Sequence, residues 1–242
     1  MHSLPDASYG RLAGQALRRH LRRLRKRLAG VPSGEDIEDV HKSRTSCRRL
    51  HAALKLFRNC FDKNQAKQWR KAIRGLLKAL GPARDTDVQI LWVRSVLDGL
   101  QDRSLRPGVH RLLVRLQQQR AAAHGNVVRA CKRFEAAGVI GEMFSAVRRL
   151  RLASGPAPPG SAHVFAQGGQ RVAERLHDLH ELAGSLDVPQ AVEAHHRLRI
   201  AAKKLRYTME SCQDAYAGAL DEAVEAAKTL QTLLGDVHDC DV

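Results

Sequence analysis

A short pattern of residues occurs twice in this 242-residue chain, and the repeat limits the folds that the chain can adopt. The first copy reads HKSRTSCRRL from His41 to Leu50, and the second reads HRLRIAAKKL from His196 to Leu205. Each copy is followed about forty residues later by a second pattern, LGPARDTDV at 80–88 and LGDVHDCDV at 234–242. Two separate patterns that recur at nearly the same offset predict a duplicated unit.

Both copies have the spacing of an amphipathic helix, in which successive side chains are turned by about 100°. In the first copy, Leu50, Leu54 and Phe57 fall opposite the basic side chains. Strand signals are nearly absent, because aromatic residues make up only 4% of the chain and no Val/Ile/Thr alternation is bounded by hairpin turns. The sequence therefore predicts an all-α protein in which each repeat is a bundle of about four helices.

Glycine, proline and capping residues give the expected limits of these helices. We expect helices over about 8–30, 33–59, 63–80, 84–100, 107–153, 162–183, 189–215 and 218–234, with a bend or break near Gly125 and Gly138 and a last segment from Gly235. The predicted organisation is a single domain with one repeat over about 8–104, connecting helices over about 105–153, a linker over 154–161 and a second repeat over about 162–242. Since only Val242 follows Asp241, the second repeat is expected to lack its last helix.

The chain is strongly basic, with 41 Lys and Arg against 25 Asp and Glu and a formal net charge of +16. The first 104 residues hold 23 basic and 10 acidic side chains, whereas residues 162–242 hold 8 and 13, so the excess precedes the linker. Solubility alone requires much less charge than this. The composition therefore indicates a polyanionic partner, such as nucleic acid or a phosphate polymer.

The remaining composition favours the cytoplasm. The five cysteines are scattered, which argues for reduced thiols rather than a disulfide framework or a zinc site. The N-terminus lacks the apolar segment of a secretory signal, and no run of 18 apolar residues could span a membrane. We therefore expect a cytoplasmic protein without membrane partners.

Basic side chains line one face of several predicted helices. On helical geometry the first copy places His41, Arg44, Arg48, His51 and Lys55 together, with Arg49 on the flank. The second copy places together His196, Arg199, Lys203 and Arg206, with Lys204 on the flank. Two more stripes consist of Arg11, Arg18, Arg22 and Arg25, and of Lys63, Lys67, Arg70, Arg74 and Lys78.

A charged stripe opposite an apolar one is also the ordinary solvated face of a helix. Such a face usually mixes signs, because like charges four residues apart repel by a few tenths of a kcal/mol. No carboxylates lie between Arg44 and Arg48, or within the 63–78 stripe, which we call the basic ladder. The like charges in both places therefore repel one another, and this favours polyanion binding. The counterpart of the ladder in the second repeat is acidic, with Asp221, Glu222 and Glu225, so the two repeats are not electrically equivalent.

The LGPARDTDV pattern adds Arg84 to the candidate anion site. Asp85 and Asp87 are expected to cap the following helix or to pair with basic residues of the preceding helices. Mg²⁺ binding by these carboxylates is a weaker alternative, and His177 with His180 lacks a third metal ligand at clear spacing. The sequence assigns no role to the matching Asp239 and Asp241.

Taken together, these patterns resemble the CHAD family, the conserved-histidine α-helical domain, over essentially the whole chain. The motifs that carry the resemblance are VHKSRTSCRRLHAALKLF, GPARDTDV, HRLRIAAKKLRY and LGDVHDCDV. The resemblance implies two pseudosymmetric four-helix bundles around a basic groove or cavity, and binding of inorganic polyphosphate, often at polyphosphate granules. By position it implies phosphate contacts from His41, Arg44, Arg48, Arg49, His196, Arg199, Lys203, Lys204 and Arg206.

Helix geometry adds a second set to that site: Lys55, Arg70, Arg74, Lys78, Arg18, Arg22, Arg25 and Arg84. The predicted function is non-catalytic binding of polyphosphate or a similar polyanion, with no cofactor and no metal. Nucleic-acid binding is one alternative, although aromatic residues that could stack on bases are not interleaved with the basic stripes. A polyphosphate-processing enzyme is another, but the chain has no GxxxxGK[ST] loop and few clustered carboxylates.

Overall fold

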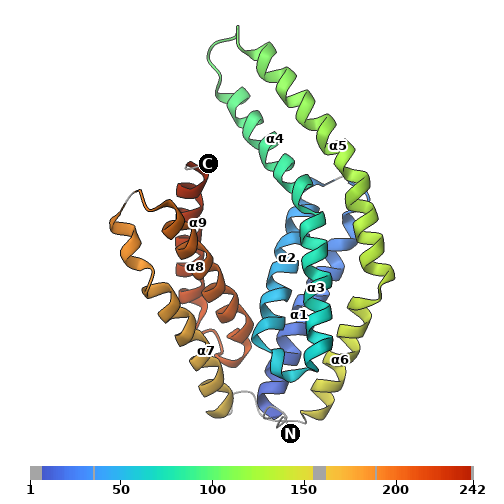
Figure 1. The fold of residues 1–242 in the computed structure, drawn as a ribbon, viewed down its shortest axis with the longest axis vertical. Helices are drawn as coiled ribbons and strands as arrows, with labels where there is room; N and C mark the ends of the chain where they lie inside the picture. The colour runs from blue at the N-terminus through green and yellow to red at the C-terminus, as the bar shows by residue number, and fades with distance from the viewer. Residues whose placement is uncertain (1–6, 35, 155–161, 189, 241–242) are drawn as a thin grey trace. The chain divides into compact units, whose positions relative to one another are not determined.

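The computed structural model describes residues 7–34, 36–154, 162–188 and 190–240, and within these ranges it contains helices and turns but no strand (Figure 1). The helices are α1 (Ala7–Gly30), α2 (Ile37–Leu56), α3 (Lys63–Ala79), α4 (Gly81–Gly99), α5 (Arg106–Ala136), α6 (Val139–Ala153), α7 (Ala162–His180), α8 (Val192–Cys212) and α9 (Asp221–Cys240). Short 3-10 segments lie at Arg58–Cys60, Ala183–Asp187 and Gln213–Ala215. The prediction of an all-α fold is confirmed.

The structure corrects two of the predicted helix limits and confirms a third. α5 runs unbroken through Gly125, because one glycine inside a long helix costs only about 1 kcal/mol. Gly138 does separate α5 from α6, and its φ of 66° is a conformation that glycine adopts without strain. α4 begins at Gly81 rather than at 84–87, because Pro82 is well tolerated in the first turn of a helix.

The second LG pattern folds differently from the first. α3 ends before Leu80 and α4 begins after it, whereas α9 continues through Leu234 and Gly235. The first pattern has Pro82 after its glycine, and the second has Asp236. Since proline removes a backbone donor and clashes with the preceding turn, only the first pattern interrupts the helix. The expectation of a new segment at Gly235 was therefore wrong.

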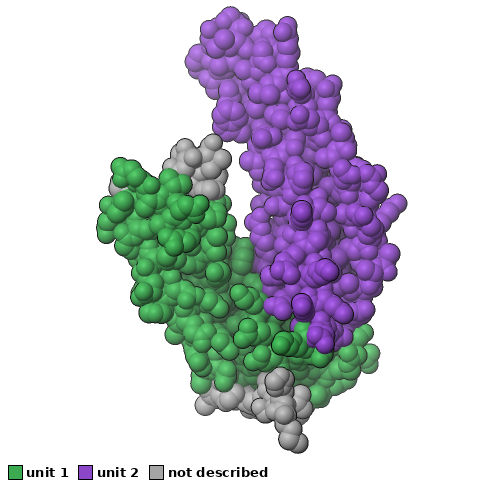
Figure 2. Space-filling view, viewed as in Figure 1, with its two compact units in different colours: residues 1–19, 52–63, 145–242 green, residues 20–51, 64–144 purple. Residues whose placement is uncertain are grey.

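The chain packs as two compact units, which are described separately (Figure 2). Unit 1 consists of residues 1–19, 52–63 and 145–242, and unit 2 consists of residues 20–51 and 64–144. Each of α1 and α2 contributes residues to both units, so the packing units do not follow the predicted repeat limits, which stay a prediction. Residues 155–161 of the predicted linker lie outside the described residues.

Unit 2 holds the first copy of the pattern, on α2, and packs it against a leucine-rich core. Leu21 and Leu24 of α1, Leu50 of α2 and Ile73 of α3 are fully buried. α4 and α5 lie side by side around a smaller apolar cluster formed by Ile90, Val93, Leu97 and Leu116. The α3–α4 bend lies beside α2, since Arg44 of α2 donates to the carbonyl oxygen of Leu77 in α3, and the candidate site is built there.

Unit 1 holds the second copy, on α8. Leu205 and Met209 of α8 pack against Val224 and Ala227 of α9, with Val172 of α7 beside them. His195 anchors the first turn of α8, because its Nε2 lies 2.8 Å from the carbonyl oxygen of Ser185 and donates to it. The apolar face of the second copy is therefore held between α7 and α9.

Candidate anion-binding site

The His41 motif, residues 41–50 of α2, presents a basic face to solvent and an apolar face to the core. Leu50 and Phe57 have no exposed surface, as the helical spacing predicts. On the other face Arg48 is exposed, and His41 and Arg44 are half-buried. The motif therefore turns its histidine and arginines away from the core of unit 2.

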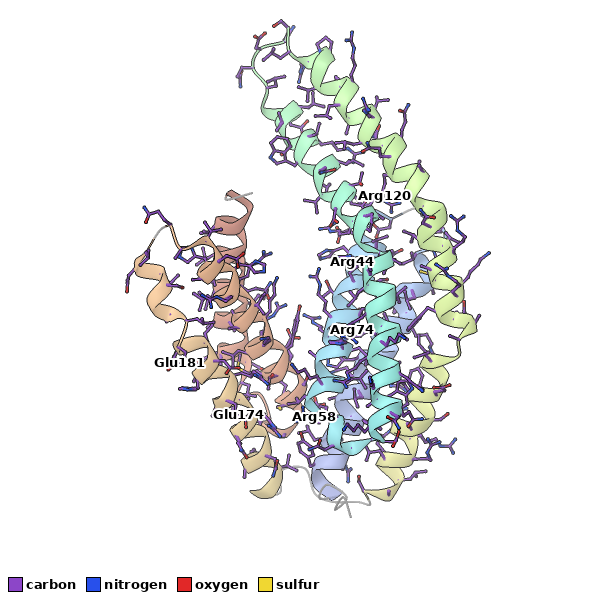
Figure 3. All side chains as sticks on the ribbon, viewed as in Figure 1. Arg44, Arg58, Arg74, Arg120, Glu174 and Glu181 are labelled. Carbon is purple, nitrogen blue, oxygen red and sulfur yellow. The ribbon has the colours of Figure 1, made fainter. Side chains whose placement is uncertain are left out.

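Arg44 does not extend freely into solvent, because it is bound to the end of α3. Its Nη1 donates a hydrogen bond to the carbonyl oxygen of Leu77 at 3.0 Å (Figure 3). The last carbonyls of a helix lack partners within the helix, so a guanidinium is a favourable partner for them. Arg44 is thus fixed at the α3–α4 bend, next to Gly81.

Arg84 brings a further cation to the same bend. Its Nη1 lies 3.7 Å from Oε1 of Glu38, in the first turn of α2. This half-buried guanidinium also acts electrostatically on His41, Arg44 and Asp87. The prediction that Arg84 belongs with the His41 motif therefore has geometric support.

The electrostatics of the bend favour an added negative charge. Burial lowers the pKa of His41, and the positive charges of Arg84, Arg48 and Arg44 lower it further against the opposing effect of Glu38. Burial, followed by Arg48, also lowers the pKa of Arg44, against the opposing effect of the Asp85 carboxylate. Each cation is thus destabilised by its cationic neighbours, and an anion bound among them would remove this repulsion.

The basic ladder of α3 continues from the bend along the same unit. Arg74, which is labelled in Figure 3, is exposed, and so is Lys78. Arg70 is half-buried, and its Nε donates to the carbonyl oxygen of Ala66 at 3.3 Å. The opposite face of α3 buries Trp69, so helical periodicity separates core from ladder here as expected.

Five other predicted residues lie on α1 and α2. In unit 2, Arg25 of α1 lies over the ring of Phe144 in α6, with its guanidinium carbon 5.2 Å from the ring centroid. Arg22 is exposed on the same helix, while Arg18 is half-buried in the part of α1 that belongs to unit 1. The remaining two are on α2: Arg49 is half-buried, and Lys55 is exposed in the part of α2 that belongs to unit 1.

The His196 motif, residues 196–205 of α8, repeats one contact of the His41 motif within unit 1. Nε and Nη2 of Arg199 each lie 3.8 Å from the position that a Cβ would take at Gly235. His196 and Lys203 are half-buried, and Lys204 is exposed. The arginine and the glycine of the two patterns are therefore neighbours in both copies.

Arg206 differs from the other predicted contacts because it is buried. Only 7% of its surface is exposed, and its Nε lies 3.8 Å from Oε1 of Glu210. Its guanidinium also lies 5.0 Å from the ring centroid of Tyr207. The positive charge of Arg206 is thus partly neutralised, and a phosphate contact from this residue stays a prediction.

Asp87 neither caps α4 nor pairs with a preceding helix, which corrects the expectation from its sequence. Its carboxylate has no exposed surface, and Nε of Arg120 in α5 donates to its Oδ1 at 2.6 Å. Burial raises the pKa of Asp87 in spite of this partner. Asp85 remains exposed in the second turn of α4. Sequence reasoning missed Arg120, because nothing in the local pattern of α5 distinguishes it.

Two further features were not anticipated from the sequence. Glu38 is the carboxylate partner of Arg84. Its place in the first turn of α2, three residues before His41, is the sequence signal that could have indicated a carboxylate near the motif. A shallow hollow lies on α5, away from the motif, and is lined by His110, Arg111, Val114, Arg115 and Gln118. Among the described residues, no three His, Cys, Asp or Glu side chains gather as metal ligands, and no helix is long and apolar enough to cross a membrane.

Comparisons with known proteins identify relatives of the chain. A family model described as the CHAD domain matches residues 15–242. No curated protein matches the chain. The crystal structure of the CHAD domain from the plant Ricinus communis is similar, with a TM-score of 0.70 and 23% sequence identity over 98% of this chain and 77% of that chain. At this identity the likeness establishes a shared fold.

Proposed function

The chain belongs to the CHAD domain family, and we propose that it is a non-catalytic protein that binds inorganic polyphosphate. The resemblance of its motifs to the family carries the expectation of this ligand. The basic residues of α2, α3 and α4 in unit 2, and of α8 in unit 1, would supply the contacts. We further propose a cytoplasmic location, with recruitment to polyphosphate granules as a consequence of binding.

One observation carries the proposal most directly: the arrangement of charge at the α3–α4 bend. His41, Arg44, Arg48 and Arg84 influence one another electrostatically, while Glu38 is the carboxylate ion-paired with Arg84. Guanidinium groups bind phosphate oxygens through short charge-assisted hydrogen bonds. A chain of phosphates can meet several such groups in succession, which a single small anion cannot do.

The residue types on the basic face of α3 favour polyphosphate over nucleic acid. The exposed ladder residues Arg74 and Lys78 have no aromatic neighbours on their face of α3, and Trp69 of the same helix is buried. Proteins that bind single-stranded nucleic acid typically stack bases on exposed rings. A ligand that consists of phosphates alone needs no such platform.

The direct test is to titrate the protein with long-chain polyphosphate, duplex DNA and RNA at equal concentrations of negative charge and several salt concentrations. We expect polyphosphate to bind tightest, with an affinity that falls as salt rises. The logarithmic slope is expected to be about −0.7 per phosphate neutralised, if single-stranded nucleic acid is a guide. Displacement of polyphosphate by duplex DNA at equal charge would contradict the proposal.

A charge-matched pair of variants locates the binding surface. Arg44→Gln with Arg199→Gln removes two positive charges from the motif helices, and Arg111→Gln with Arg115→Gln removes two from exposed positions of α5. The first double variant is expected to lose about a hundredfold or more in affinity, since bonds to charged groups contribute about 1.5–3 kcal/mol each. The second is expected to lose about twofold from the smaller net charge alone. Equal losses would reject the motif helices as the site.

The non-catalytic part of the proposal has its own test. Incubation with polyphosphate and Mg²⁺ is expected to release no orthophosphate above a protein-free control. Release that Asp85→Asn abolishes would instead identify an enzyme, because the exposed Asp85 is a carboxylate at the bend that is available to a metal ion.

A further inference from the structure

The glycine that opens α4 lies directly beneath an arginine of the proposed site. A Cβ built on Gly81 would be 3.1 Å from Nη1 of Arg44, closer than most side chains pack. The same Nη1 donates to the carbonyl oxygen of Leu77 at 3.0 Å. The guanidinium therefore lies against bare backbone on one side and is hydrogen-bonded to α3 on another.

A positive φ does not explain why this residue is glycine. In the described part of the chain, the glycines with positive φ are Gly34, Gly138 and Gly218. Gly81 is not among them, and it forms part of the regular α-helix. A left-handed conformation is therefore not the reason for glycine at this position, and the close approach of Arg44 is a spatial reason.

The second copy places the same two residue types together. Gly235 lies within α9, and Nε and Nη2 of Arg199 are each 3.8 Å from its Cβ position. In both copies Nε of the arginine is buried without a hydrogen-bond partner among the described residues. The contact is looser in the second copy, since 3.8 Å is an ordinary van der Waals distance.

We propose that Gly81 is a positioning residue, whose missing side chain makes the seat in which Arg44 is held for phosphate binding. This inference rests on the proposed polyphosphate function. It adds that the glycine of the LG pattern acts through the arginine of the His motif, although the two are 37 residues apart in the chain.

The test is Gly81→Ala, measured by titration with long-chain polyphosphate at low salt. The added methyl group forces the Arg44 guanidinium to shift by a few tenths of an ångström, and the strained side chain is expected to weaken binding about two- to tenfold. Gly235→Ala is expected to change affinity less than about twofold, because its 3.8 Å contacts leave room for a methyl group.

Gly75→Ala is the matched control. Gly75 lies in α3 of the same unit, is exposed, and has nothing within 4 Å of its Cβ position. This change adds the same methyl group to a helical glycine of the same unit, at a position where the methyl group meets no neighbour. Its affinity is expected to equal that of the wild type, and a loss equal to that of Gly81→Ala would overturn the proposal.

Pro82 supplies a second reason for glycine at position 81, because a residue before proline is disfavoured in a helix when it has a Cβ. A double-mutant cycle separates this effect from the seat. If Gly81 acts through Arg44, then Gly81→Ala causes no further loss of affinity in an Arg44→Ala background. Additive losses would overturn the proposal.

The same four proteins are unfolded in urea without ligand, which tests the seat independently of the proposed function. We expect Gly81→Ala to lower the unfolding midpoint more in the wild-type background than in the Arg44→Ala background. Equal shifts in the two backgrounds would overturn the seat. If the four proteins show this coupling but the wild-type protein binds no polyphosphate, the proposed function is wrong and the contact between Gly81 and Arg44 is still established.

Discussion

The His41 and His196 motifs share a residue spacing but lie in different electrical surroundings. Beside the His41 motif, α3 presents Arg74 and Lys78, and α4 adds Arg84. The corresponding part of α9 begins with Asp221 and Glu222, both exposed. The shared spacing therefore gives both motifs a helix with an apolar face. The neighbouring helices determine how positive the electrostatic potential is beside each motif.

The difference extends to the ends of the two motif helices. Near the end of α8, the carboxylate of Glu210 forms an ion pair with Arg206. The backbone carbonyl oxygen of Glu210 also accepts a hydrogen bond from Arg19 of α1 at 2.9 Å. Near the end of α2, the equivalent stripe ends in the exposed Lys55. We therefore expect the His41 motif to supply most of the affinity for a polyanion and the His196 motif to supply less.

The largest expected effect concerns the ion pair that joins α4 to α5 beside the His41 motif. Asp87→Asn removes the charge that neutralises Arg120, whose side chain is only 12% exposed. Leaving one partner of a buried pair without the other costs about 3–5 kcal/mol, so the free energy of unfolding should fall by about that amount. Urea unfolding followed by circular dichroism measures it.

Asp85→Asn is the control for that prediction, because Asp85 is exposed two residues away and should change stability by less than about 0.5 kcal/mol. If both variants unfold at the wild-type urea concentration, the buried pair does not hold the α4–α5 hairpin. The difference between the surroundings of the His41 and His196 motifs would then consist of surface charge alone.

The next effect compares the two basic surfaces by removing three charges from each: one from the His41 motif with two from the α3 ladder of the same unit, and three from the His196 motif. One variant combines Arg48→Gln, Arg74→Gln and Lys78→Gln, and the other combines Arg199→Gln, Lys203→Gln and Lys204→Gln. The first is expected to lose at least about a hundredfold in affinity for polyphosphate and the second about tenfold, since charge-assisted bonds contribute about 1.5–3 kcal/mol where they form. Titration at one low salt concentration measures both.

The salt dependence of the same two variants sharpens the comparison. The slope of log affinity against log salt should become shallower by about 0.7 for each phosphate contact that is lost. A larger change in the second variant than in the first would reverse the ranking of the motifs. Equal changes would mean that the acidic start of α9 does not matter for binding.

The smallest expected effect concerns the pH dependence of His41. Its pKa lies below 6.5 in the free protein, because of burial and the neighbouring arginines. Bound phosphates favour the imidazolium and raise this pKa, so the complex takes up a proton. Affinity for long-chain polyphosphate should therefore rise, by about threefold, as the pH falls from about 7.5 to 5.5.

His41→Gln should remove this rise, whereas His110→Gln, at an exposed position of α5, should preserve it. An unchanged pH profile in His41→Gln would place the proton uptake elsewhere. Without ligand the sign is opposite: the unfolded chain takes up the proton more readily, so the contribution of His41 to stability is lost as the pH falls below 6.5.

The sequence by itself determined the class of fold and the two faces of the motif helices. Helical periodicity correctly separated Leu50 and Phe57 from Arg48, because a residue's angle on a helix follows from its position in the chain. The family was also recognisable from the spacing of the motifs. These properties are local, or repeat at a fixed offset, and need no knowledge of the partners.

Tertiary structure alone decided which charged groups are neutralised and which remain available. The burial of Asp87 against Arg120, the pairing of Arg84 with Glu38 and the contact of Arg44 with Gly81 join residues on different helices. The burial of Arg206 likewise depends on which elements pack against α8. Helical periodicity gives the direction of a side chain, but its exposure and its partners depend on how separate helices pack, and the sequence pattern does not contain that information.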